Sequence, residues 1–115
     1  MLRAITVVAA VLLAPLSSSA ETIAVKYYGG LELSPFQCAD ISRSSFIKRV
    51  CFDEKKSFMV IRLKDTYYPY CAIDAATVTQ LLNAPSIGRY YNARIRSQGS
   101  VRGPFDCRDH PAPQY

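Results

Sequence analysis

Four cysteines are the side chains of this 115-residue chain with the clearest potential for chemistry: Cys38, Cys51, Cys71 and Cys107. An even number of cysteines in so short a chain is typical of a disulfide-bonded fold, and two disulfides are expected. The rival interpretation is a zinc site, but no two cysteines have the C-x₂₋₄-C spacing of zinc ligands, and His110 is the only histidine. The pattern therefore predicts disulfides and no metal or cofactor.

Residues suited to catalysis are few. His110 lies in a proline-flanked segment close to the end of the sequence, away from any candidate nucleophile. Asp53 and Glu54 are adjacent in a turn, so their carboxylates point in different directions, unlike a convergent acid and base. The cysteines, once oxidised, offer no thiolate. The sequence predicts no catalytic residues, and we expect a protein that is not an enzyme.

Three tyrosines around Pro69 are candidates for ligand binding. In an extended strand Tyr68 and Tyr70 share one face, and Tyr67 lies on the other. Two rings on one face can form a stacking platform for bases or sugars. Alternatively, both rings pack against helices and satisfy their hydroxyls locally. If they do, Tyr67 is the better candidate for an exposed contact.

An arginine cluster in the last third of the sequence is the second candidate binding surface. Arginine is suited to bidentate contacts with carboxylates and phosphates. Arg89 and Arg96 are seven residues apart and share the solvent face of a predicted helix, and Arg102 and Arg108 follow it. Arg94 falls within the apolar arc of that helix, where an arginine extends along the surface or pairs with an acid. The alternative is a solvated basic face.

Two smaller residues of the same helix are interpreted as structural. Asn92 is expected to hydrogen-bond the backbone and orient the helix against a sheet. Gly88 is expected to allow close helix packing, since no glycine-rich phosphate motif surrounds it.

The tyrosines belong to a pattern of three predicted strands. Strands are expected over residues 46–52, 58–63 and 67–73, because β-branched and aromatic residues are frequent there and short polar turns separate the segments. Such short connections predict antiparallel hairpins, and hence a three-stranded meander. Pro69 cannot donate to a ladder, so the third strand is expected at an edge.

The arginines belong to the second of two predicted helices. Asp74 is a suitable N-cap for a helix that ends before Pro85, and Ser86 can cap a second helix over residues 87–96. The apolar residues recur at helical spacing in both segments. The predicted fold class is therefore α+β, with a three-stranded antiparallel meander followed by two short helices packed on one face, stapled by disulfides.

The meander narrows the choice of disulfide pairs. Cys51 and Cys71 lie at the same end of the sheet but two strand spacings apart, roughly 9–10 Å, which exceeds the reach of a disulfide. Two arrangements remain: Cys38–Cys51 with Cys71–Cys107, or Cys38–Cys71 with Cys51–Cys107. The first closes the shorter loops and is preferred.

Residues 1–20 have the pattern of a secretory signal peptide, with one basic residue, a short apolar run and small residues before a predicted cleavage after Ala20. The apolar run is too short for a bilayer span, so no transmembrane segment is expected after cleavage. Residues 21–43 are an N-terminal extension with a short strand at 25–28, and residues 97–115 form a tail that Cys107 alone is expected to hold. The predicted location is periplasmic or secreted.

Two strings occur in order within residues 44–96: YPY at residues 68–70 and SIGRYYN at residues 86–92. They are similar to the Y-x-Y and S-x-G-x-[YF]-[YF]-N segments of the KTSC domain, so the stretch over residues 44–96 resembles that family. The domain is named for its occurrence at the C-terminus of some lysyl-tRNA synthetases and is also found as single-domain bacterial proteins. Two cysteines inside the stretch, and Asp74 in place of a common proline, depart from the family pattern. The synthetase context implies RNA binding.

Charge is compatible with several partners. The sequence has 14 basic and 9 acidic residues, a net charge of +5, and loses one positive charge with residues 1–20. We expect an uncharacterised exported KTSC-domain protein that is a non-enzymatic binding module for a protein or an anionic envelope component. The alternative is binding of RNA or single-stranded nucleic acid through the tyrosines and arginines, since a positive charge also favours phosphates.

Overall fold

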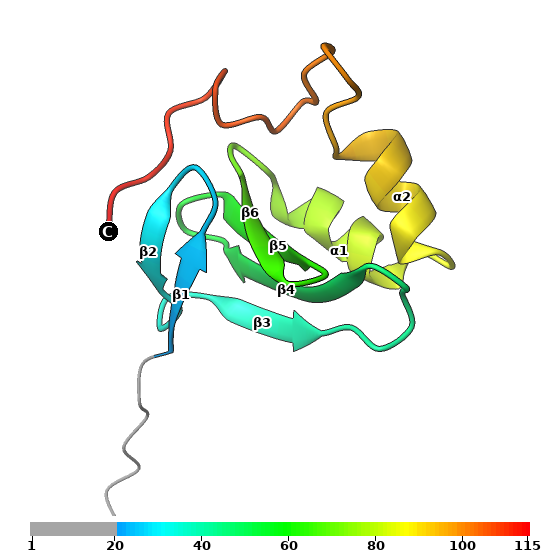
Figure 1. Cartoon of the computed structure of the whole chain (residues 1–115), viewed down its shortest axis with the longest axis horizontal. Coiled ribbons are helices and arrows are strands. Elements are labelled where there is room, and N and C mark those ends of the chain that lie inside the picture. Colours follow the sequence, from blue (N-terminus) through cyan, green and yellow to red (C-terminus); the bar gives the residue numbers. More distant parts are fainter. Residues whose placement is uncertain (1–20) are drawn as a thin grey trace, which may run out of the picture.

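A curled six-stranded sheet with two helices on one face forms the body of the protein (Figure 1). The computed structural model describes residues 21–115. The strands are β1 (Thr22–Val25), β2 (Gly29–Glu32), β3 (Gln37–Asp40), β4 (Ile47–Asp53), β5 (Phe58–Leu63) and β6 (Thr66–Tyr70), and the helices are α1 (Ala75–Asn83) and α2 (Ile87–Arg94). The strand order is β2-β1-β6-β5-β4-β3. The α+β class is confirmed, whereas the count of three strands was too low.

The predicted meander forms the centre of this sheet. Strands β4, β5 and β6 pair antiparallel, with β5 in the middle. β5 has the predicted bounds. β6 ends at Tyr70, three residues earlier than predicted, because the next amide, that of Cys71, donates to the carbonyl of Phe105 in the C-terminal segment.

The three strands that the prediction lacked all come from residues 21–43. β1 and β2 form a hairpin, and β3 pairs antiparallel with β4. Each of these strands is only four residues long, too short for a clear alternating pattern, and they are ordered by partners distant in sequence. The predicted strand at 25–28 is wrong, because only Val25 is in β1 and the next residues make the hairpin turn.

Pro69 lies in the interior of the sheet order, not at an edge as predicted. β6 has β5 on one side and β1 on the other, but the parallel pairing with β1 consists of Val25 opposite Tyr67. The Tyr67 carbonyl accepts a hydrogen bond from Lys26 on that side. Backbone groups of residues two apart in a strand face the same neighbouring strand, so the nitrogen of Pro69 lies on the same side as the Tyr67 carbonyl. On that side it lies beyond the last residue of β1, and no hydrogen bond of the ladder is lost.

Both faces of the sheet are covered, because side chains of β5 alternate between two apolar clusters. Met59 and Ile61 pack with the helices, and Phe58 and Val60 pack with residues of the N-terminal hairpin. All four are fully buried. The helices cover one face, as predicted, and the second cluster, on the opposite face, is a feature that the meander alone did not indicate.

The helix caps are those predicted. The Asp74 carboxylate accepts from the amide of Thr77, and the Ser86 hydroxyl accepts from the amide of Arg89. α2 ends at Arg94, earlier than predicted. The amides of Ile95 and Arg96 both donate to the Tyr91 carbonyl, and the bond from Arg96 spans five residues, a wider turn with which the helix ends.

Cys38 pairs with Cys51, and Cys71 pairs with Cys107, which is the shorter-loop arrangement. Cys38 and Cys51 are direct partners in the β3–β4 ladder. The predicted signal peptide lies outside the described residues. Within the described part of the sequence, no helix is long and apolar enough to span a membrane.

The C-terminal tail has more anchors than the predicted one at Cys107. The Tyr28 hydroxyl donates to the Pro113 carbonyl (2.7 Å), and the Tyr115 hydroxyl donates to the Asp53 carboxylate (2.8 Å). The Tyr115 ring also packs near Phe58. The tail therefore returns past the N-terminal hairpin and closes one side of the molecule (Figure 1).

Candidate functional site

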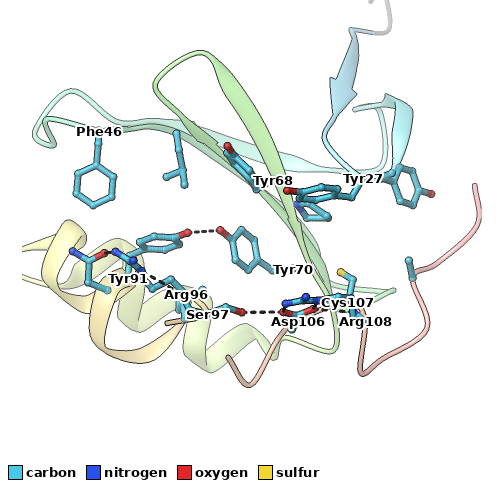
Figure 2. A pocket seen from close by; sticks show the side chains of 16 residues that line it. Tyr27, Phe46, Tyr68, Tyr70, Tyr91, Arg96, Ser97, Asp106, Cys107 and Arg108 are labelled. Atoms are coloured by element: carbon cyan, nitrogen blue, oxygen red, sulfur yellow. Dashed lines mark hydrogen bonds and ion pairs between the residues drawn. The ribbon is translucent and has the colours of Figure 1, made fainter. Parts of the chain in front are cut away.

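An open groove of about 770 Å³ lies between β6, the end of α2, the tip of the β1–β2 hairpin and the C-terminal tail. Figure 2 shows its side chains. Its base is aromatic, with Tyr70 and Tyr91 in edge-to-face contact at 6.0 Å between ring centroids. Apolar side chains, among them Phe46 and Ile95, line much of the remainder. The groove therefore combines apolar surface with the polar groups described below.

The hydroxyls of Tyr70 and Tyr91 point at each other across the base of the groove and are hydrogen-bonded (Figure 2). Both side chains are buried, with residue exposures of 8% and 5%. Burial raises the pKa of both phenols, and the positive charge of Arg96 partly counters this effect. The pair is neutral at ordinary pH and carries two hydroxyl protons, of which the mutual bond uses one.

Arg96 extends from the residue after the α2 cap and lines the groove. Its guanidinium donates to the Asn92 side-chain oxygen at 3.2 Å and to the Ser97 carbonyl at 3.3 Å. Both acceptors are neutral, and among residues 21–115 no carboxylate pairs with this side chain within 4.0 Å. Arg96 is thus an exposed cation at the groove whose charge is not compensated by an ion pair.

Asp106 and Arg108 form a closed polar unit on the tail side of the groove. The Asp106 carboxylate accepts from the Arg108 guanidinium at 2.7 and 3.0 Å and from the Ser97 hydroxyl at 2.9 Å. These hydrogen bonds, the arginine first among them, hold the pKa of Asp106 well below its usual range. The unit fixes Cys107 between its two members, and their opposite charges offset each other next to the groove.

The hairpin tip contributes an exposed tyrosine to the rim. Tyr27 is 85% exposed and has a φ of 67°, a left-handed conformation that is uncommon for a bulky residue. The Lys26 ammonium lies 5.3 Å from the centroid of the Tyr27 ring and 5.6 Å from that of Tyr68. The rim thus presents two aromatic rings with a cation between them.

The structure brings together six of the residues that the sequence singled out: Tyr68, Tyr70, Asn92, Arg96, Cys107 and Arg108. Tyr70 is a core residue with its hydroxyl bonded locally, whereas Tyr68 remains partly exposed. Asn92 is exposed, and its side-chain oxygen binds Arg96, not the backbone as expected.

Three other candidates lie outside this groove. Tyr67 is half-buried on the opposite face of β6, where its hydroxyl accepts from Arg49 at 3.3 Å. Arg94 is exposed at the last residue of α2, not laid along the apolar surface or paired with an acid as expected. Arg89 is exposed beside a smaller hollow of about 260 Å³ that Gly88 also lines.

Gly88 packs directly under an aromatic ring. A Cβ atom at this position would lie 2.8 Å from Cε1 of Phe46. The Phe46 ring is in turn in edge-to-face contact with Tyr91, at 6.0 Å between centroids. The absence of a side chain at Gly88 therefore allows α2 to pack closely against Phe46, the residue before β4.

Sequence reasoning missed the groove residues outside the meander and helices, notably Tyr27, Ser97 and Asp106. The disulfide partner of Cys71 offered a signal, because pairing with Cys107 places the neighbours of Cys107 beside the end of β6. His110, the residue considered for catalysis, contacts the Pro104 carbonyl. The described residues hold no cluster of three or more potential metal ligands.

These features define a small disulfide-bonded α+β domain with an aromatic, arginine-bearing groove. A family model for the KTSC domain matches residues 43–98, so this protein belongs to the KTSC domain family. No curated protein matches the sequence. The match contains β6, α2 and Arg96, whereas the hairpin tip and Asp106 lie outside it. The groove is thus built from the family domain together with both flanking segments.

Proposed function

We propose that this protein is an exported binding module that holds a protein partner or an envelope component in the groove. The observation that carries the proposal is the juxtaposition of an aromatic base with the uncompensated guanidinium of Arg96. Concave, mostly apolar sites with a few convergent polar groups are typical of ligand binding. The proposal assigns no catalytic residue.

Export is part of the same proposal. Two disulfides are consistent with an oxidising compartment outside the cytoplasm. The pattern of residues 1–20 predicts a cleaved signal peptide, and the mature protein then starts at Glu21. N-terminal sequencing of the protein purified from cell fractions tests this part. A cytoplasmic protein that still starts at Met1 contradicts it.

The groove favours a protein partner over a nucleic acid. A nucleic-acid strand presents successive phosphates, whereas Arg96 is the only arginine among the described lining residues that is left without an ion-pair partner, since Asp106 offsets the charge of Arg108. Apolar walls such as those at Phe46 and Leu63 fit aliphatic or aromatic side chains better than a sugar–phosphate backbone. These two features support a peptide segment as the occupant.

In-cell photo-crosslinking tests the groove as a binding site. A photoreactive phenylalanine analogue replaces Tyr68, which lines the groove, or Thr79, which is exposed on α1 away from it. We expect discrete protein adducts from position 68 and none of comparable yield from position 79. Equal yields at both positions, or no adduct at either, contradict the proposal.

Nucleic-acid binding is the second candidate, because Arg89, Arg94 and Arg96 are all exposed along and just after α2. Binding of single-stranded RNA through these side chains would weaken steeply as salt rises, since phosphate contacts release counterions. Fluorescence anisotropy with a labelled RNA, repeated with Arg89→Ala and Arg96→Ala, measures this. Absent or salt-independent binding removes the candidate.

A further inference from the structure

We infer that the partner presents a carboxylate, and that the Tyr70–Tyr91 hydroxyl pair together with Arg96 binds it at the base of the groove. The inference rests on the proposed function and names the ligand group for that site. The carboxylate comes from an acidic side chain or from the C-terminus of a polypeptide, flanked by apolar residues. The two sources share one chemistry, and the test below separates them.

The first observation is a spare donor at a buried position. Tyr70 and Tyr91 are both more than nine-tenths buried and have one hydrogen bond between their hydroxyls. Two hydroxyls carry two donor protons, and the mutual bond consumes one. Among the described residues neither hydroxyl has another acceptor. A buried donor without an acceptor is costly, so an oxygen from a ligand or solvent is required here.

The second observation is the charge next to this donor. Arg96 lines the same groove and acts electrostatically on both phenols, lowering their pKa against the rise caused by burial. Its two acceptors are neutral oxygens at 3.2 and 3.3 Å, which are long for a guanidinium. A carboxylate can replace these weak contacts with charge-assisted bonds while its second oxygen accepts from the hydroxyl pair.

The third observation explains why the protein's own acid does not occupy this position. Asp106 is the groove carboxylate, but its oxygens are already bonded to Arg108 and Ser97. Because Asp106 offsets the charge of Arg108, Arg96 is the described groove arginine that remains for a ligand, and a single carboxylate with apolar neighbours against Phe46 and Leu63 fits it.

The test uses peptides of defined chemistry and ¹⁵N-labelled protein over residues 21–115. The probes are the acetylated, amidated pentapeptide Ala-Leu-Glu-Leu-Ala and its Gln counterpart, and the tripeptide Ala-Leu-Leu with a free or an amidated C-terminus. We expect the carboxylate member of at least one pair to bind about tenfold more tightly, in line with a charge-assisted hydrogen bond. The amide signals of Tyr70, Tyr91 and Arg96 should shift.

Three variants locate the site. Arg96→Gln and Tyr70→Phe should each reduce the affinity for the carboxylate peptide about tenfold, and bring it close to that of the neutral peptide. Arg94→Gln is the matched control, because Arg94 is exposed two residues away but does not line the groove. It should leave the affinity unchanged.

Two results overturn the inference. One is equal affinity for the charged and the neutral member of both peptide pairs. This comparison uses the unsubstituted protein, so it does not depend on the folding of any variant. The other is an equal loss of affinity in Arg94→Gln and Arg96→Gln. If position 68 gives protein adducts but the peptide pairs show no preference for the carboxylate member, the proposed binding module is retained and only the carboxylate as its ligand group is rejected.

Discussion

Single side chains determine the shape of the groove and the protonation state of its buried tyrosines. Burial raises the pKa of the phenols of Tyr28, Tyr70, Tyr91 and Tyr115. A folded-state pKa above the unfolded value stabilises the protein below pH about 10, and this contribution is lost as the pH rises through the folded pKa. The neutral hydroxyl pair therefore persists over the physiological pH range.

Alkaline titration measures this property. Four of the eight tyrosines have a raised pKa, so the phenolate absorbance at 295 nm should stay incomplete near pH 10 while the protein is folded, because these four do not ionise there. The remainder should appear together with alkaline unfolding, followed by circular dichroism. Ionisation of all eight tyrosines in one step, with the fold intact, would contradict the burial described for them.

Gly88→Ala tests the close contact between α2 and Phe46. The added methyl group would lie 2.8 Å from the Phe46 ring, which Tyr91 hinders from moving away. Overpacking of this kind costs about 1–3 kcal/mol and outweighs the gain of roughly 1 kcal/mol in helix propensity. Urea denaturation should show a net loss of about 1 kcal/mol. Gly30→Ala, where a Cβ meets no atom within 4 Å, is the control and should be nearly neutral.

At the scale of elements, the disulfides attach two different segments. Cys38–Cys51 links β3 to its ladder neighbour, whereas Cys71–Cys107 ties the tail to the end of β6 and closes a wall of the groove. The sequence separations are 13 and 36 residues. If disulfides act by restricting the unfolded state, the longer loop stabilises more, by about 1 kcal/mol for this ratio of lengths.

Replacing each pair of cysteines by alanine tests the difference. The Cys71→Ala/Cys107→Ala variant should lose more unfolding free energy than Cys38→Ala/Cys51→Ala, by about 1 kcal/mol. Only the first should also increase hydrogen exchange at the backbone amide of position 71, which donates to the Phe105 carbonyl in the tail. An equal loss in both variants, with the tail still protected from exchange, contradicts the role given to the second disulfide.

Strong local patterns explain which elements were predictable. The centre of the sheet and both helices follow from the alternation in β5 and from the caps Asp74 and Ser86, which depend on near neighbours. β1, β2 and β3 have four residues each and depend on partners distant in sequence. For the same reason Tyr68, Tyr70 and Arg96 could be proposed as site residues, whereas Asp106 could not.

At the scale of the whole molecule, the flanking segments complete the domain. The cluster around Phe58 and Val60 includes Val25, Leu31 and Leu33 of the N-terminal segment. Removing that segment would expose Phe58, which is fully buried. Residues 44–96 alone are thus not expected to bury the face of β5 that carries Phe58 and Val60.

A fragment of residues 44–96 tests this dependence. Without β1, β2, β3 and the tail it should lose cooperative unfolding and dispersed amide signals, because one face of β5 has no cover. The protein over residues 21–115 is the reference. A fragment that unfolds cooperatively with a similar midpoint would show that the flanking segments are dispensable.

The groove as a carboxylate-binding site for a protein partner is the central claim, and one comparison tests it most directly. The photoreactive analogue at position 68 is expressed in the otherwise unchanged protein and in the Arg96→Gln variant, with equal amounts of folded protein. We expect a discrete adduct that decreases about tenfold in Arg96→Gln. An adduct of undiminished yield in the variant, or none in the parent protein, would contradict the claim.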